Sequence, residues 1–284
     1  MVKKFKFKKI GLLIYPNMLK RKEGENINGP SLIKVPKWIN NPLGKYYLYF
    51  SHHKGKYIRM AFSNSIEGPY TIFNGGVMNL KDSPGKNHIA SPDLHVDYIN
   101  QKIIMYYHTF YKDYQYTFRS ISSDGKKFVS KNKKLGYYYF RVFKFNNQFY
   151  IISKGKDSYG IIYKKLNKSW TVIKKKFIKN IRHTAVCVEK NNIFLFYSKI
   201  GDLQESIYCS NLDLTGFKLF NTYKIVKPSL EYEGNNFVKK NSREGMELEY
   251  VNQVRDPAFF KEKNKKYLLY SVSGEKGIAL GRLI

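Results

Sequence analysis

The chain has 284 residues, 43% of them hydrophobic and 17% aromatic, with a formal net charge of +30. This length allows one large domain or two small ones, and the apolar content suffices for a packed core. Two cysteines exclude a disulfide framework, and no apolar run reaches transmembrane length. Cys187 and Cys209 are expected to be free core residues. The apolar part of the basic segment 1–16 is too short for a signal peptide, so a cytoplasmic location is expected.

A sequence pattern that occurs five times along the chain predicts five similar structural units. Each copy begins with a polar cluster and continues through a strand and a tight turn into an aromatic-rich second strand, and most copies add a third. The second strands are expected at 45–50, 102–107, 148–152, 193–197 and 266–270. A period of roughly 40 to 50 residues is typical of β-propeller blades. We therefore predict an all-β, five-bladed β-propeller in a single domain, with blades at 27–73, 88–130, 137–175, 180–222 and 252–284.

The two ends of the chain are expected to meet in the last blade. Its third strand, at 277–283, leaves the outer place of that blade empty, and the hydrophobic segment 5–15 belongs to no repeat. We expect this N-terminal strand to complete blade five and close the ring. The long interval before the fifth unit predicts one large insertion there.

The excess of positive charge comes mainly from lysine. Of the 51 basic residues 43 are Lys, and they are spread over every blade. Proteins that read nucleic acids favour Arg, whose guanidinium group makes paired hydrogen bonds to phosphates and bases. The composition therefore indicates a solvated surface and argues against a nucleic acid as the partner. Binding of another polyanion is the alternative.

The innermost strands of a propeller all begin at the same end of its central channel. The loops between second and third strands and the links between blades meet at this end too. It collects five of the six His and three of the eight Arg, together with several acids. The opposite end carries short turns rich in Asn and Lys, which offer little chemistry. We expect one functional face, at the strand-start end.

The candidate site residues come from this face. Asp93, Asp256 and Glu233 are the candidate catalytic acids. The candidate substrate-binding residues are Asn28, Ser91, His52, His88, Arg141, Arg182, His183, Glu205 and Arg255. No metal site is expected, because the spacing of His88, His95 and Asp93 is not diagnostic of one, and no cofactor is implied.

The strand starts resemble those of a known group of enzymes. The five-bladed propeller glycosidases, glycoside hydrolase families 43, 32 and 130, have strand starts similar to Ser91-Pro92-Asp93 and Arg255-Asp256-Pro257. After the third strand of a blade they also have a segment similar to Ser65-Ile66-Glu67-Gly68-Pro69-Tyr70. The resemblance covers nearly the whole chain. It implies a carbohydrate ligand, and the Arg residues of the face could hold an anionic group on it.

The resemblance also implies chemistry by paired carboxyl groups. Glycoside cleavage needs one carboxyl group that protonates the leaving oxygen and another that activates water or attacks directly. In families 43 and 32, acids open the first strands of blades one, two and three. Here only Asp93 matches, since blade one has Gly29 before its proline and blade three has Arg141. We expect Asp93 and Asp256 to face each other across a funnel as an inverting pair instead.

The leading functional hypothesis is a glycoside hydrolase-like enzyme. The missing acids in blades one and three support an alternative, a carbohydrate-binding propeller without catalysis. A glycoside phosphorylase, in which Arg and His hold phosphate, is a further alternative. A second acid opposite Asp93 in an open funnel would favour the hydrolase, whereas a single acid among several Arg would favour phosphorolysis or binding alone.

Overall fold

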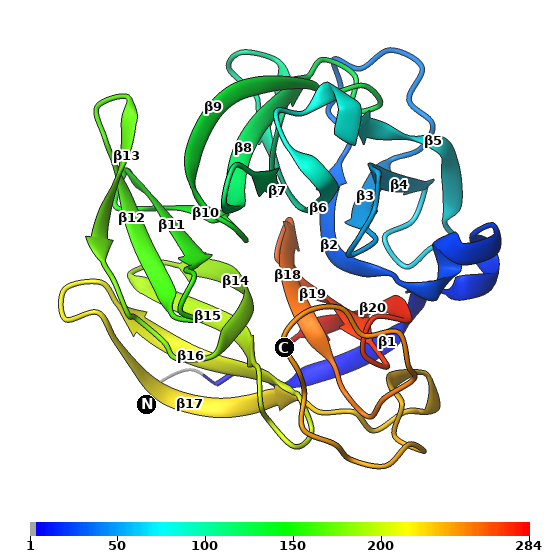
Figure 1. Ribbon diagram of the computed structural model, residues 1–284, viewed down its shortest axis with the longest axis vertical. Helices are drawn as coiled ribbons and strands as arrows, with labels where there is room; N and C mark the ends of the chain where they lie inside the picture. The colour runs from blue at the N-terminus through cyan, green and yellow to red at the C-terminus, as the bar shows by residue number, and fades with distance from the viewer. Residues whose placement is uncertain (1–3) are drawn as a thin grey trace.

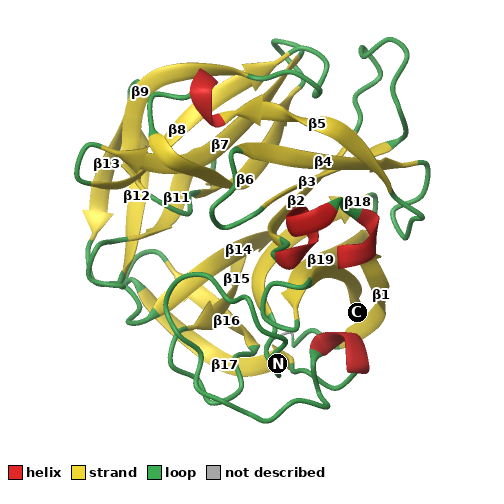
Figure 2. Ribbon diagram, turned by 45° about the vertical axis from the view of Figure 1, so that its right-hand side comes forward, coloured by secondary structure: helices red, strands yellow, loops and turns green. Residues whose placement is uncertain are grey.

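The computed structural model describes residues 4–284 and contains five four-stranded sheets around a central channel (Figure 1). The predicted all-β, five-bladed propeller is confirmed. Helical structure in the described part is limited to short 3₁₀ turns (Figure 2). These turns span Pro16–Met18, Arg21–Glu25, Leu80–Asp82 and Glu231–Glu233. None of the helices in the described part is long and apolar enough to cross a membrane.

The first four blades are each built from consecutive strands, in order from the channel outward. Blade one contains β2 (Asn28–Lys34), β3 (Tyr46–Ser51), β4 (Tyr57–Ser63) and β5 (Thr71–Asn79). Blade two contains β6 (Lys86–Asp97), β7 (Lys102–Tyr111), β8 (Tyr114–Ser122) and β9 (Val129–Tyr137). Blade three contains β10 (Arg141–Phe145), β11 (Gln148–Lys154), β12 (Gly160–Leu166) and β13 (Ser169–Lys174). Blade four contains β14 (Ile181–Glu189), β15 (Asn192–Lys199), β16 (Ile207–Asp213) and β17 (Lys218–Val226).

The fifth blade joins the two ends of the chain, as the sequence predicts. It contains β18 (Arg255–Glu262), β19 (Lys265–Val272) and β20 (Gly277–Leu283), with β1 (Phe7–Ile14) as its outer strand. β1 runs antiparallel to β20, from the pair Phe7–Leu283 to the pair Ile14–Ile278 (Figure 1). Ile14 is fully buried in the cluster between blades five and one. The ring is therefore closed by backbone hydrogen bonds between strands from opposite ends of the sequence.

Several outer strands extend beyond the predicted blade limits. Blade one continues to Asn79, blade two to Tyr137 and blade four to Val226. The sequence gives little sign of these extensions because outer strands have one edge and much of one face in solvent, which weakens the hydrophobic pattern. In β9, for example, the stretch 131–134 is exposed and reads Lys-Asn-Lys-Lys.

The expected insertion lies between β17 and β18, at residues 227–254. The buried core lies mainly between neighbouring blades and is rich in Tyr, Phe, Ile and Leu. Cys187 and Cys209 are both buried and free, as predicted, and pack in one of these clusters.

Candidate functional site in the central channel

A backbone irregularity recurs at the start of the innermost strands. In β2, β6 and β18 the pairing register breaks where a residue with positive φ precedes a proline. These residues are Gly29 (φ 59°), Ser91 (φ 52°) and Asp256 (φ 53°). Such a bulge interrupts the regular alternation of side chains along a strand. Asp256 therefore corresponds to Ser91 and Gly29, whereas Asp93 lies two residues further along and corresponds to Ser31.

Two of the bulge residues, Ser91 and Asp256, line a small cavity at the strand-start end of the channel. Its lining includes the predicted residues Asn28, Ser91, Arg182, His183 and Asp256. His108 of β7 and the loop residues His53, Tyr139 and Glu275 complete the polar lining. The cavity measures only about 10 Å³, which is room for about one water molecule. The cluster of polar groups that the sequence predicts does form, but it has no space for a sugar ring.

A second, larger cavity lies further along the channel, toward the ends of the innermost strands. It measures about 510 Å³ and is lined by Asp93 and His95 from β6, by Arg141, and by the ends of β2 and β18. Asp93 and Asp256 therefore line different cavities, and the expected pairing of these two acids across one funnel is wrong. The cause is the bulge, which places residues before and after the proline toward different parts of the channel.

Four buried charges lie beside the small cavity and form a chain of ion pairs. Glu205 is 2.7 Å from Arg182 and 3.4 Å from Arg255, measured between nitrogen and oxygen atoms. Arg255 also lies 3.5 Å from Glu275. All four side chains are at least 96% buried. Two cations and two carboxylates thus neutralise one another inside the ring.

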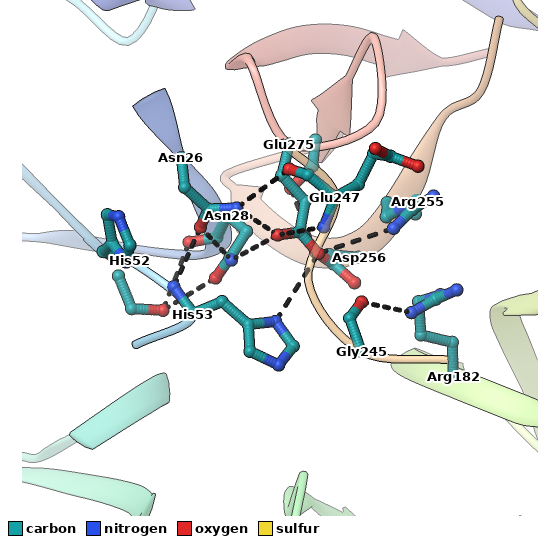
Figure 3. Close-up of polar contacts among 12 residues, drawn as sticks. Asn26, Asn28, His52, His53, Arg182, Gly245, Glu247, Arg255, Asp256 and Glu275 are labelled. Carbon is teal, nitrogen blue, oxygen red and sulfur yellow. Dashed lines mark hydrogen bonds and ion pairs between the residues drawn. The ribbon is translucent and has the colours of Figure 1, made fainter. Parts of the chain in front are cut away.

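Glu275 is the most heavily hydrogen-bonded acid of the group. Figure 3 shows Asn26, Asn28, His53 and Arg255 around it. Asn28 donates to Glu275 at 3.2 Å, and Asn26 makes a short hydrogen bond to the same oxygen. Burial alone would raise the pKa of Glu275, but His53, Arg255 and Asn26 together hold it below its usual range. Glu275 is therefore an ionised carboxylate held in place by these hydrogen bonds and by Arg255.

Asp256 has the opposite behaviour. Burial, with the nearby charge of Glu275, raises its pKa from 3.8 to about 6, although Arg182 and Arg255 oppose the change. Its carboxyl group accepts a hydrogen bond from Ser271 at 3.2 Å and lies 3.7 Å from Nδ1 of His183. Burial, together with Arg141 and other cations, lowers the pKa of His183 well below its usual value. The cavity thus holds a neutral imidazole beside a carboxyl group that is protonated more readily than usual.

The raised pKa of Asp256 gives the protein a pH-dependent stability term. The folded state favours the protonated form, so this contribution is fully present below the unfolded pKa of 3.8 and is lost as the pH rises through about 6. We expect the wild type to lose about 3 kcal/mol relative to Asp256→Asn between about pH 4 and about pH 7. Urea unfolding of both proteins across this range measures the difference. In the control Asp157→Asn, which changes an exposed acid, the free energy of unfolding should vary with pH as it does in the wild type. The same pH dependence in Asp256→Asn and the wild type would contradict the assignment.

Two chain segments cover the small cavity. Tyr139 has a φ of 62°, which is rare for a non-glycine residue, and its ring lies 3.7 Å from that of His183 between centroids. The insertion contributes the carbonyl oxygens of Arg243 and Gly245, which accept hydrogen bonds from Arg182 at 2.6 and 3.5 Å. The buried Arg182 therefore fastens the insertion over the strand-start end of the channel.

Asp93 is a hydrogen-bond acceptor in the wall of the large cavity. Its Oδ2 lies 2.9 Å from Nε2 of His95 and accepts the backbone N–H of Val142 at 3.0 Å. Burial alone would raise the pKa of Asp93, but His95, Arg141 and the Val142 N–H lower it overall. The buried Nη2 of Arg141, in the same wall, has no hydrogen-bond partner among residues 4–284. This wall therefore presents an ionised acid and an imidazole, and a guanidinium group with one unpaired nitrogen is buried behind them.

Glu233 lies outside both cavities. It is fully buried behind blade five, where it accepts hydrogen bonds from Tyr270 at 2.8 Å and from the backbone N–H of Ser229 at 2.8 Å. It also makes a short ion pair with Lys9 of β1. Glu233 therefore ties the insertion and the N-terminal strand to blade five, and this position gives it no access to a ligand in the channel.

His52 and His88 also fall outside the linings of both cavities. Nδ1 of His52 accepts the backbone N–H of Lys54 at 3.1 Å, and burial with nearby Arg59 lowers its pKa to about 4. His88 interacts with Gln115 at 3.1 Å. Within the described part of the chain, no group of three or more His, Cys, Asp or Glu side chains is arranged to hold a metal ion.

The residues that sequence reasoning missed fall into two groups. The topology rule places Glu275, His53 and His108 at the strand-start end, but they were not among the candidate site residues. Tyr139 follows no local pattern. The large cavity includes Lys34, Tyr98 and Glu262, which lie at the turn end that the sequence suggested to be chemically poor.

Comparison with known proteins finds the same fold in solved structures at low sequence identity. No family model matches the chain. It is 29% identical to the uncharacterised protein R118 of Acanthamoeba polyphaga mimivirus, over 91% of this chain and 83% of that protein. A glycosyl hydrolase from Bacteroides ovatus superposes with a TM-score of 0.67 at 12% identity, over 90% of this chain and 83% of the other. The GH43_1 enzyme of Xanthomonas citri, solved in complex with xylotriose, superposes with a TM-score of 0.63 at 11% identity, over 98% of this chain and 88% of the other. The chain thus has the five-bladed fold of these glycoside hydrolases.

Proposed function

We propose that this protein binds a carbohydrate in the large cavity of its central channel and does not hydrolyse it there. The observation that carries the proposal is that the cavity large enough for a sugar and the carboxyl group with a raised pKa lie in different parts of the channel. The large cavity has a volume of about 510 Å³, within the range of about 300–1,000 Å³ common for small-ligand sites. The one carboxyl group of the channel with a raised pKa, Asp256, lines a cavity of about 10 Å³ instead.

The large cavity lacks the acid that hydrolysis requires. A glycosidase needs a carboxyl group that is protonated at working pH to donate to the leaving oxygen. Asp93 and Glu262 are the acids in this cavity. The pKa of Asp93 is lowered as described above, and the ion pair of Glu262 with Lys34 lowers the pKa of Glu262 as well. Both carboxylates are therefore suited to accept hydrogen bonds from hydroxyl groups.

A carbohydrate fits the remaining chemistry of this cavity. Asp93 and His95 offer hydrogen bonds to hydroxyl groups, Arg141 has its unused Nη2, and Tyr98 adds an exposed aromatic ring. Sites that recognise small polar ligands combine aromatic surface with a few fixed polar groups in this way. The fold shared with glycoside hydrolases, one of them solved with xylotriose, supports the same ligand class.

We expect Asp93→Asn and His95→Gln each to weaken glycan binding about tenfold or more, a loss of ~1.4 kcal/mol. A glycan array identifies the ligand and calorimetry measures its affinity for each variant. Asp113→Asn, which changes an exposed acid in the turn between β7 and β8, is the matched control and should bind like the wild type. Full affinity in both cavity variants would place the ligand elsewhere.

A second candidate function, hydrolysis at the small cavity, is favoured by one observation. Asp256 and Glu275 have pKa values displaced in opposite directions, which is a pattern of acid–base pairs in enzymes. This activity would require Tyr139 and the insertion to move. A screen of chromogenic glycosides, with and without phosphate, tests it. Turnover that Asp256→Asn abolishes and Asp93→Asn leaves intact would establish hydrolysis and overturn the binding-only proposal. No observation favours phosphorolysis, because Arg182 and Arg255 are already paired with carboxylates.

A further inference from the structure

A groove between blades two and three gathers positive charge without any acid. It has a volume of about 490 Å³. Six of its lining side chains are cations: Arg119, Lys131, Lys133, Lys134, Lys165 and Lys168. The remaining lining residues are Tyr106, Leu135, Asn167, Ser169 and Trp170. The sequence suggested that lysines cover the surface evenly, whereas the fold concentrates several of them here.

The cations of this groove are arranged in rows across neighbouring strands. In blade two, Tyr106, Arg119 and Lys131 are directly opposite one another on β7, β8 and β9. In blade three, Lys165 is opposite Trp170 on β12 and β13. Each row therefore sets an aromatic ring beside cationic side chains.

These cations are not neutralised within the protein. None of the six forms an ion pair with an acid in the part of the chain that the structure describes. Arg119 and Lys131 lie directly opposite each other, although like charges in this arrangement destabilise a sheet. By contrast, Lys34 at the mouth of the large cavity is paired with Glu262. An anionic ligand would relieve the repulsion that the fold leaves in the groove.

We propose that this groove binds single-stranded nucleic acid. The charged rows would follow the phosphate backbone, and Trp170, which is half-buried and lies opposite Lys165, would stack on a base. Grooves that combine cations along a backbone path with aromatic stacking platforms are characteristic of single-strand binding without sequence preference. The site is separate from the central channel, so it does not depend on the carbohydrate proposal.

Salt dependence provides the first test. Labelled oligo(dT) and oligo(U) of about 15 nucleotides are titrated by fluorescence anisotropy at several salt concentrations. Six neutralised phosphates predict a slope of about −4 in the plot of log affinity against log salt. The triple variant Lys131→Gln, Lys133→Gln, Lys168→Gln should reduce the slope to about −2. The matched control is Lys175→Gln, Lys176→Gln, Lys179→Gln, which removes the same charge from exposed positions elsewhere and should keep the wild-type slope. An equal loss of affinity and of salt slope in both triple variants would overturn the assignment of the site.

Stacking provides the second test. The chain has two tryptophans, so Trp38→Phe leaves Trp170 as the sole tryptophan, and its fluorescence should be quenched on oligonucleotide binding. Trp170→Ala should weaken binding about tenfold without changing the salt slope. Heparin is the competing probe. Two results together would overturn the proposal and assign the groove to anionic glycans. Heparin would bind with the same affinity and salt slope as the oligonucleotide, and the oligonucleotide would leave the fluorescence of Trp170 unquenched.

Discussion

Replacing Glu205 with Gln is expected to lower the free energy of unfolding by about 3–5 kcal/mol. Glu205 is completely buried and is the acid that both Arg182 and Arg255 contact. Its removal leaves two buried guanidinium groups with one remaining carboxylate, Glu275, beside Arg255. Urea unfolding at neutral pH, followed by tryptophan fluorescence and circular dichroism, measures the loss.

The effect of this substitution should depend on pH. Burial alone would raise the pKa of Glu205, but Arg182 and Arg255 lower it overall. Its stabilising contribution is therefore present above the unfolded pKa of 4.5 and is lost as the pH falls further. The difference in the free energy of unfolding between the wild type and Glu205→Gln should therefore become smaller as the pH falls below 4.5. Glu249→Gln, which removes an exposed partner of Lys240, is the control and should leave the urea midpoint unchanged. An unchanged midpoint for Glu205→Gln would show that the network is not needed for stability.

Removing residues 1–15 is expected to prevent folding. The deletion takes away β1, and with it Leu13 and Ile14, which are 4% and 0% exposed. Loss of one such side chain in a core costs about 2–5 kcal/mol, and a whole domain is stable by only about 5–15 kcal/mol. The deletion also leaves Glu233 buried without Lys9 and exposes the edge of β20. Gel filtration and circular dichroism should show aggregated or unfolded protein.

Complementation distinguishes loss of the strand from a general effect of truncation. A synthetic peptide with the sequence of residues 1–16, added during refolding, should restore the sheet signal because it can pair with β20. The same peptide with Leu13→Asp and Ile14→Asp should not, since it cannot bury those positions. A truncated protein that folds alone with the wild-type urea midpoint would mean that β1 is not required for closure.

The fold could be predicted from the sequence because its signals are local and repeated. Tyr47, Tyr107 and Tyr270 in the aromatic strands are fully or almost fully buried, so packing between blades dictates which residues stand there. Ring closure also follows from counting, since the fifth unit lacks one strand and the N-terminal segment has no other partner. The outer strands were placed less well, because solvent rather than packing sets their composition.

The composition of the site could be predicted only in part. Strand-start topology correctly collected Arg182, His183 and Asp256 at one end. It could not show that Asp93, two residues beyond a bulge residue, lines another cavity, because this depends on backbone angles rather than on residue type. Nor could it foresee the closed mouth, which depends on Tyr139 and on an insertion fastened by Arg182.

The separation of the ionic network from the large cavity affects how such a protein can diverge. The network lies at one end of the channel, whereas the large cavity is bordered by turn residues such as Tyr98 and Lys263 at the other. Groups that are distant and share no partners contribute additively to stability. With the ligand in the large cavity, as we propose, ligand preference can change through substitutions in surface turns while the buried charges that stabilise the ring stay fixed. Selection can then act on recognition and on folding almost independently.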